Sequence, residues 1–262
     1  KIQVESGYVK ARAPQGLKGA EIFLEIASVG ATENLIMAAV LAEGKTVIHN
    51  AAEEPEITDL ITFLVKMGAK ISGAGTSVVE IEGVRSLRSI SHSIIGDRVE
   101  AGTFLIAGAA LGGEIEVQGF DPNHITVVLE KLKMSGANLE ISQDSVKLGM
   151  SLSRPEPVDV ETGVYPGFPT DMQAQYMVLN CIASGKSVIQ ERIFENRFLH
   201  VQELSRLGAV IELRGNSTAV VTGVNKLTAA QVMATDLRAS SSLVIAALIA
   251  QGRTVIDRIY HI

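Results

Sequence analysis

The sequence repeats itself at intervals of about 70 residues, and this period restricts the possible folds more than any other feature. Four segments share an apolar run, a glycine and a β-branched run: LIMAAVLAEGKTVI (35–48), FLIAGAALGGEIEV (104–117), YMVLNCIASGKSVI (176–189) and LVIAALIAQGRTVI (243–256). The marker glycines are 69, 72 and 67 residues apart, and they are Gly44, Gly113, Gly185 and Gly252. A second marker (MGAKI, SGANL or LGAVI) follows the first three by 24, 23 and 23 residues. Two markers in one phase indicate a repeated structural unit.

Each unit is interpreted as helix, strand, helix, strand, turn and strand. The apolar run predicts a helix that is buried on every side, with the marker glycine as its C-cap, and the β-branched run predicts a strand. Residues 57–65 carry apolar side chains at i, i+3, i+4, i+7 and i+8, which predicts an amphipathic helix with counterparts at 124–134 and 199–207. Hairpins are expected at 69–81, 137–148 and 209–222.

This pattern predicts an α/β (α+β) fold in which buried helices are surrounded by sheets, rather than a Rossmann sheet. Residues 1–32 resemble the tail of a unit, and 226–262 the opening of another. We expect a domain boundary near Gly96, so that 1–95 is part of a first domain and 96–262 most of a second. A helix such as 243–250 would lose on the order of ten kcal/mol without its packing partners. The chain is therefore expected to be a piece of a longer one, with that missing remainder as its partner.

Composition excludes several classes of protein. The chain is 47% hydrophobic with a net charge of −6, and only 4% of its residues are aromatic. These values argue against disorder and against nucleic-acid binding by base stacking. Because no run approaches about 18 apolar residues, no membrane insertion is expected. The one cysteine, Cys181, is expected in the core, which leaves no disulfide framework or cysteine-based zinc site and favours a reducing compartment. The five histidines show no metal-ligand spacing and are expected in loops or at the surface, so we expect no metal site.

Polar residues gather at the starts of two of the apolar helices. Thr170 and Gln173 have the spacing of a capping box around Asp171. Asp171 either stabilises the dipole of that helix or acts as a general base at the edge of an apolar core. Asp236 and Arg238 open the last helix, where the arginine either pairs with Asp236 or binds a carboxylate or phosphate.

Two loops hold further candidates. Residues 195–198 (ENRF) lie between a strand and a helix, where a solvated turn is the simpler interpretation. Residues 27–32 (ASVGAT) precede the first apolar helix. Their amides either bind an anion or only begin the helix, because most helix N-termini have this composition.

Five segments together resemble one family: GFPTDMQAQ (167–175), FENRF (194–198), QVMATDLRAS (231–240), DRIYHI (257–262) and SVGAT (28–32). Over essentially its whole length the chain is similar to the UDP-N-acetylglucosamine 1-carboxyvinyltransferases, which are enolpyruvyl transferases of peptidoglycan synthesis. The resemblance implies an inside-out α/β barrel of two domains, each with three such units around an approximate threefold axis. It implies transfer of the enolpyruvyl group of phosphoenolpyruvate to the 3-hydroxyl of UDP-N-acetylglucosamine, with release of phosphate. It also implies a cytoplasmic enzyme without a cofactor.

The resemblance also implies roles for individual residues. Asp171 is similar to the general base that takes the proton of the 3-hydroxyl. Arg197 and Arg238 are similar to the pair near the phosphoenolpyruvate carboxylate, and Asp236 to the acid that accompanies Arg238. The substrate-binding positions implied, besides Asp171, are Ile26, Ala27, Ser28, Val29 and Gly30 in the loop that lines the uridine nucleotide, and Ile193 as a backbone contact to the nucleotide sugar. Family members often carry lysine in the stretch where this chain has Ile26.

Several groups that the family uses are not in this sequence. They are an N-terminal Lys-Asn pair, a mobile loop with a reactive cysteine and an adjacent arginine, and a final arginine expected just beyond Ile262. Cys181 does not correspond to the reactive cysteine. We therefore expect no transferase activity from the chain alone. Two alternatives remain open: a non-catalytic repeat module that binds a ligand or a protein, and an enolpyruvyl transferase with another acceptor, such as shikimate 3-phosphate.

Overall fold

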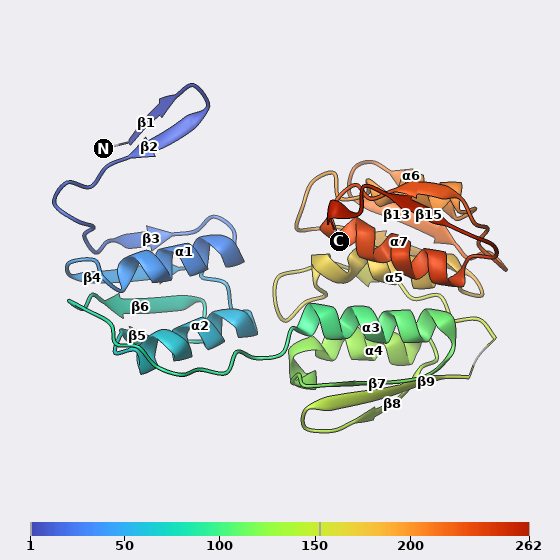
Figure 1. Ribbon diagram of the computed structural model, residues 1–262, viewed down its shortest axis with the longest axis horizontal. Coiled ribbons are helices and arrows are strands. Elements are labelled where there is room, and N and C mark those ends of the chain that lie inside the picture. The colour runs from blue at the N-terminus through green and yellow to red at the C-terminus, as the bar shows by residue number, and fades with distance from the viewer. Residues whose placement is uncertain (1, 152, 262) are drawn as a thin grey trace. The chain divides into compact units, whose positions relative to one another are not determined.

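The computed structural model describes residues 2–151 and 153–261, and the chain divides into two compact units, Lys1–Ile95 and Gly96–Ile262. Each unit encloses its own hydrophobic core. Figure 1 shows both units.

The first unit begins with a hairpin of β1 (Ile2–Glu5) and β2 (Tyr8–Ala11). Its other elements are β3 (Glu21–Phe23), α1 (Val29–Ala39), β4 (Lys45–His49), α2 (Pro55–Lys66), β5 (Lys70–Ser72) and β6 (Val78–Glu82). The strands after the hairpin form one sheet in the order β3-β4-β6-β5, in which β3 and β4 are parallel and the other pairs antiparallel.

The second unit contains three successive groups of elements. The first group is α3 (Arg98–Leu111), β7 (Gly113–Gln118), η1 (Pro122–Ile125), α4 (Thr126–Met134), β8 (Asn138–Ile141) and β9 (Ser145–Met150). The second is β10 (Val160–Glu161), η2 (Thr170–Met172), α5 (Gln173–Cys181), β11 (Lys186–Gln190), α6 (His200–Arg206), β12 (Val210–Arg214) and β13 (Thr218–Thr222). The third is β14 (Gln231–Met233), α7 (Leu237–Ile249), β15 (Val255–Asp257) and η3 (Ile259–His261). The sheet β10-β11-β13-β12 has the strand order of the sheet in the first unit.

The repeated unit predicted from the sequence is confirmed. The turn that ends its amphipathic helix has nearly the same backbone conformation in three copies. After α2, α4 and α6 a marker glycine adopts a positive φ: 105° at Gly68, 97° at Gly136 and 89° at Gly208. Each glycine amide bonds the carbonyl three residues back, and the next amide bonds the carbonyl five residues back. This is the Schellman motif, whose left-handed residue is usually glycine because a Cβ would be strained there.

The first set of marker glycines does not cap the helices as predicted. The C-caps of α1, α3, α5 and α7 are Val40, Gly112, Ile182 and Ala250. Gly44 and Gly252 instead have positive φ angles of 93° and 109° in the turn before the next strand. The glycines are needed for the change of direction into the strand and not for the end of the helix.

Short strands precede three of the four apolar helices, and the sequence pattern did not predict them. β3, β10 and β14 each pair in parallel with the strand that follows the helix, namely β4, β11 and β15. With two or three residues each, these strands are too short to show an alternating pattern.

The apolar helices of the second unit lie against one another, with sheets outside them (Figure 1). α5 contacts α3, α7, β11 and β13, and every one of its residues is buried. The prediction of burial on every side is wrong for α1, α3 and α7, which expose Met37, Phe104 and Leu248. Apolar composition shows that a helix can be buried, but the neighbouring elements decide which of its sides are covered.

Candidate active site

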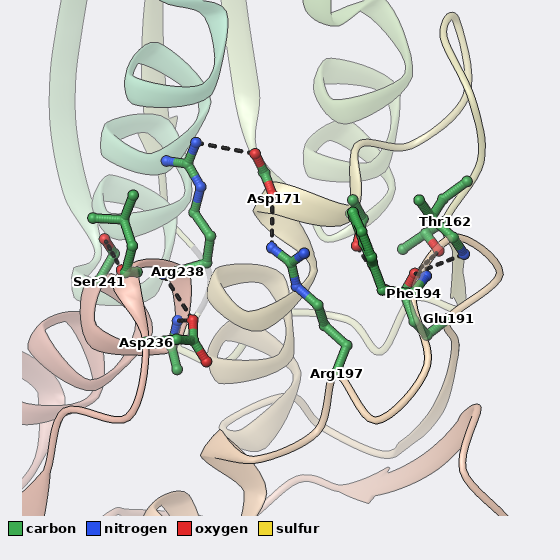
Figure 2. Close-up of polar contacts among 12 residues, drawn as sticks. Thr162, Asp171, Glu191, Phe194, Arg197, Asp236, Arg238 and Ser241 are labelled. Carbon is green, nitrogen blue, oxygen red and sulfur yellow. Dashed lines mark hydrogen bonds and ion pairs between the residues drawn. The ribbon is translucent and has the colours of Figure 1, made fainter. Parts of the chain in front are cut away.

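An aspartate lies between two arginines at the start of α5. The Asp171 Oδ1 accepts a hydrogen bond from Arg197 Nη2 at 2.7 Å, and its Oδ2 accepts one from Arg238 Nη2 at 3.0 Å (Figure 2). All three side chains are between a quarter and about a third exposed. The sequence places these residues 26 and 67 positions apart, and the fold brings their charged groups together.

Each of the three residues is fixed by a different local structure. Asp171 lies in η2, and its carbonyl accepts a hydrogen bond from Gln175 on the next turn at 2.9 Å. Arg197 lies in the loop between β11 and α6, with its guanidinium 4.8 Å from the centre of the Phe194 ring. Arg238 lies in the first turn of α7. Solvent can therefore reach a carboxylate whose charge is balanced by two guanidiniums.

Asp236 caps α7 and does not hold the Arg238 side chain. Its Oδ1 accepts hydrogen bonds from the backbone amides of Arg238 and Ala239 at 3.0 and 2.9 Å. Of the two alternatives for Arg238, the internal pair with Asp236 is therefore not formed, and the guanidinium bonds Asp171 instead. Asp236 fixes the turn from which Arg238 projects.

The predicted capping box at Thr170 and Gln173 is wrong. The helix begins one turn later than expected, because Thr170–Met172 forms a separate 3₁₀ turn and Gln173 is the first residue of α5. The Thr170 hydroxyl donates to Glu191 at 2.9 Å, and the buried amide of Gln173 has no partner among the described residues.

The predicted substrate-binding residues fall into both units. Ile26, Ala27, Ser28, Val29 and Gly30 belong to the first unit, where Ser28 caps α1 and accepts from the Ala31 amide at 3.3 Å. Ile26 is exposed. Ile193 belongs to the second unit, and its amide donates to Glu191 at 2.9 Å. Ile262, at the end of the DRIYHI segment, lies outside the described residues.

Sequence reasoning missed the buried carboxylate of Glu191. It accepts four hydrogen bonds, one from Thr162 after β10 and three from the segments that carry Asp171 and Arg197. A signal was present, because Ser187, Ile189 and Glu191 follow the period of two that marks the buried face of β11. A charged residue in an inward position of that series indicates a specific polar role.

Histidine His200 was expected at the surface, but it is 2% exposed at the start of α6. Its Nε2 has no hydrogen-bond partner in the described part of the chain. Burial lowers the pKa of His200 to about 4; the nearby Asp236 carboxylate opposes this change and the Arg197 charge adds to it. The imidazole is therefore neutral at pH 7. The buried Phe198 two residues earlier was the local signal that this position faces the core.

We expect this histidine to make the protein less stable in mild acid. Because the pKa is near 6.5 in the unfolded chain and about 4 in the folded one, the unfolded state binds the proton more tightly. The stabilising contribution is complete above pH 6.5 and is lost as the pH falls toward 4. Between pH 7 and pH 5 the free energy of unfolding should fall by about 2 kcal/mol more than in His200→Gln. Urea unfolding of both proteins at the two pH values measures this difference, and equal losses would contradict it.

In the described part of the chain, neither the thiol of Cys181 nor a cluster of metal ligands adds a catalytic group to the site. Cys181 is fully buried, as predicted, and burial raises the pKa of its thiol to about 12. Within the described ranges there is no group of three or more histidine, cysteine, aspartate or glutamate residues that could hold a metal ion. None of the helices there has the length and apolarity needed to cross a membrane.

The chain is similar to known proteins over its whole length. The family model described as EPSP synthase (3-phosphoshikimate 1-carboxyvinyltransferase) matches residues 1–262. UDP-N-acetylglucosamine 1-carboxyvinyltransferases from Shewanella halifaxensis and Shewanella pealeana are each 55% identical to the chain, over 262 and 261 residues. The whole chain is covered in both cases, and it spans 62% of the length of each relative.

Solved structures share the fold at lower sequence identity. The enolpyruvyl transferase NikO from Streptomyces tendae superposes with a TM-score of 0.87 at 24% identity, covering 100% of this chain and 65% of NikO. An EPSP synthase from Acinetobacter baumannii gives a TM-score of 0.69 at 20% identity, with 98% and 63% covered. The predicted α/β fold of buried helices and outer sheets is thus confirmed as one found in enolpyruvyl transferases.

Proposed function

Because this chain belongs to the EPSP synthase family, we propose that it is part of an enzyme that transfers the enolpyruvyl group of phosphoenolpyruvate to the 3-hydroxyl of UDP-N-acetylglucosamine. The relatives that are 55% identical carry the name of this reaction, and this favours the nucleotide sugar over shikimate 3-phosphate as the acceptor. Both substrates are small molecules, and neither needs a metal or an organic cofactor from the protein.

The observation that carries the proposal is the Asp171 carboxylate between two guanidiniums. When the acceptor hydroxyl adds to C2 of phosphoenolpyruvate, its proton must leave and C3 must gain one. Loss of phosphate and of a proton from C3 then restores the double bond. In this scheme Asp171 takes the hydroxyl proton as general base. Arg197 and Arg238 exchange the Asp171 oxygens for the carboxylate or phosphate oxygens of the ligand, which bind a guanidinium in the same way.

The remaining residues orient these groups. Asp236 fixes the first turn of α7 and with it Arg238. Ile26, Ala27, Ser28, Val29 and Gly30 line the uridine nucleotide, where the exposed Ile26 offers an apolar contact in place of a charge. Ile193 contacts the nucleotide sugar through its carbonyl, because its amide is already bound to Glu191.

A cytoplasmic location belongs to the same proposal. The single cysteine leaves the chain without an internal disulfide, as is usual in reducing compartments. We further propose that turnover needs segments of the relatives beyond the 62% that this chain spans, because the described residues supply the base and two cations but no acid for C3.

The isolated 262-residue chain is expected to release no phosphate from phosphoenolpyruvate above background. A chimaera in which it replaces the matching region of the Shewanella halifaxensis relative should regain turnover with UDP-N-acetylglucosamine. A phosphate-release assay measures both proteins, with shikimate 3-phosphate as the competing acceptor. Turnover only with shikimate 3-phosphate would show that the proposed acceptor is wrong. A folded chimaera that is inactive with both acceptors would contradict the proposed function.

A further inference from the structure

A buried carboxylate behind the site joins the two segments that carry its charged groups. Glu191 is 2% exposed and follows the last residue of β11. Its Oε1 accepts from the Thr162 hydroxyl at 2.9 Å and from the amides of Ile193 and Phe194 at 2.9 and 3.1 Å. Its Oε2 accepts from the Thr170 hydroxyl at 2.9 Å. Figure 2 shows the Thr162 and Phe194 side of this network.

Four donors on two oxygens is the bonding pattern of a carboxylate. An ionised glutamate has about four acceptor positions and no donor, whereas glutamine would present two N–H donors to groups that also donate. The Thr162 hydroxyl has its proton available for Glu191, because it accepts from the Arg192 amide at 2.8 Å. These hydrogen bonds offset the cost of burying the charge. A glutamine here could keep the three hydrogen bonds to Oε1, but its Nε2 would have to donate to the Thr170 hydroxyl, which reverses that bond and leaves the second N–H without an acceptor among these groups.

Glu191 is hydrogen-bonded to one residue next to Asp171 and to another that contacts Arg197. On one side, the Thr170 hydroxyl is bound to Glu191, and Thr170 directly precedes Asp171. On the other side, the amide of Phe194 is bound to Glu191, and the Phe194 ring lies 4.8 Å from the Arg197 guanidinium. Asp171 and Arg197 are themselves joined by a hydrogen bond of 2.7 Å, so the two segments meet both at Glu191 and at this ion pair. Both ends of that ion pair are therefore tied to one buried group.

We propose that Glu191 is a positioning residue that sets the Asp171–Arg197 geometry by holding their two segments together. The proposal rests on the function proposed above for Asp171 and Arg197. Glu191 is too buried to meet a substrate, so it acts through these two residues. Misplacing a reacting group by about 1 Å can cost on the order of 100-fold in rate, so the position of this pair matters for the chemistry.

The first part of the test needs no substrate. A guanidinium held by a carboxylate rotates slowly about its Cζ–Nε bond, and the ¹⁵N side-chain spectrum of Arg197 reports this rotation. In Glu191→Gln, measured in the 262-residue chain, we expect the Arg197 rotation to become at least several-fold faster and the Ile193 and Phe194 amide signals to shift. The matched control is Glu161→Gln, which removes an exposed carboxylate one strand away that bonds Arg192 at 3.1 Å. It should leave the Arg197 signal unchanged.

The second part measures the affinity of the chimaera for phosphoenolpyruvate by calorimetric titration. Glu191→Gln should weaken binding about tenfold, and Glu161→Gln by less than about twofold. In an Arg197→Ala background, Glu191→Gln should have no further effect on this affinity, because Arg197 is the one of the two positioned residues that binds phosphoenolpyruvate in the proposed function. A purely structural role would weaken binding equally in both backgrounds.

The outcomes separate this proposal from the proposed function. Unchanged Arg197 rotation in a folded Glu191→Gln protein would overturn the positioning role, and so would equal losses of affinity in both backgrounds. Faster rotation in the chain, together with an unmutated chimaera that does not bind phosphoenolpyruvate, would support the positioning role and count against the proposed function. If Glu191→Gln does not fold, Thr170→Val removes only one of the four hydrogen bonds. It should then speed Arg197 rotation to a smaller extent, and no change would overturn the proposal.

Discussion

Replacement of Asp171 by asparagine is expected to lower the kcat of the chimaeric transferase by about 10²–10⁴-fold. The amide keeps the size and shape of the side chain but cannot take a proton from the acceptor hydroxyl. It also removes the charge that Arg197 and Arg238 share. Because both guanidiniums become free for an anion, the KM for phosphoenolpyruvate should not rise. Steady-state phosphate release at varied phosphoenolpyruvate concentration measures both quantities.

The control for this variant is Asp144→Asn in the exposed turn between β8 and β9. It makes the same chemical change in the same unit, away from both arginines, and should keep kcat within about twofold of the unmutated chimaera. A kcat for Asp171→Asn within tenfold of that of the control would exclude Asp171 as the general base.

Truncation of Leu179 to alanine is expected to be among the most destabilising single changes in the second unit. Leu179 lies in the last turn of α5 and is 0% exposed. Removing a fully buried leucine costs about 2–5 kcal/mol, from lost burial and from the cavity that remains. For a unit of this size that corresponds to a fall in Tm of about 5–15 °C. Calorimetry of the 262-residue chain measures the transition of this unit.

Leu248→Ala on α7 is the matched control, because it removes the same atoms from a side chain that is 59% exposed. Both leucines come from apolar runs that look alike in the sequence. We expect the control to lower the free energy of unfolding by less than about 1 kcal/mol. Similar losses for the two variants would mean that α7 is covered in solution on the side that bears Leu248.

The repeated unit could be predicted because its signals are local. An amphipathic helix such as α2 shows its buried face through the spacing of Ile57, Ile61 and Leu64. Gly68, Gly136 and Gly208 mark turns whose backbone favours glycine. The short strands β3, β10 and β14 could not be predicted, because their two or three residues are defined by a parallel partner rather than by their own pattern.

The residues of the site could be predicted from the sequence, but the hydrogen bonds between them could not. Segments such as GFPTDMQAQ and FENRF identified Asp171 and Arg197 through a resemblance to a family. From their spacing, an ion pair between Asp236 and Arg238 was one of two alternatives. In the structure the Asp236 carboxylate accepts hydrogen bonds from helix amides, and the Arg238 guanidinium bonds Asp171. Competition among nearby donors and acceptors decides such partners, and the donors come from distant parts of the chain.

The sequence by itself determined the repeated unit, the α/β class, the marker turns and the identity of the charged residues at the site. These follow from local periodicity, backbone restrictions on residues other than glycine, and motif resemblance. Burial on every side was predicted for all four apolar helices, and only the tertiary structure decided that it holds for α5 and not for α1, α3 and α7. Only the tertiary structure decided that Asp171 lies between Arg197 and Arg238, and that Glu191 joins their two segments. Burial and hydrogen-bond partners depend on which elements meet in space, and for these residues the partners lie tens of positions away along the chain.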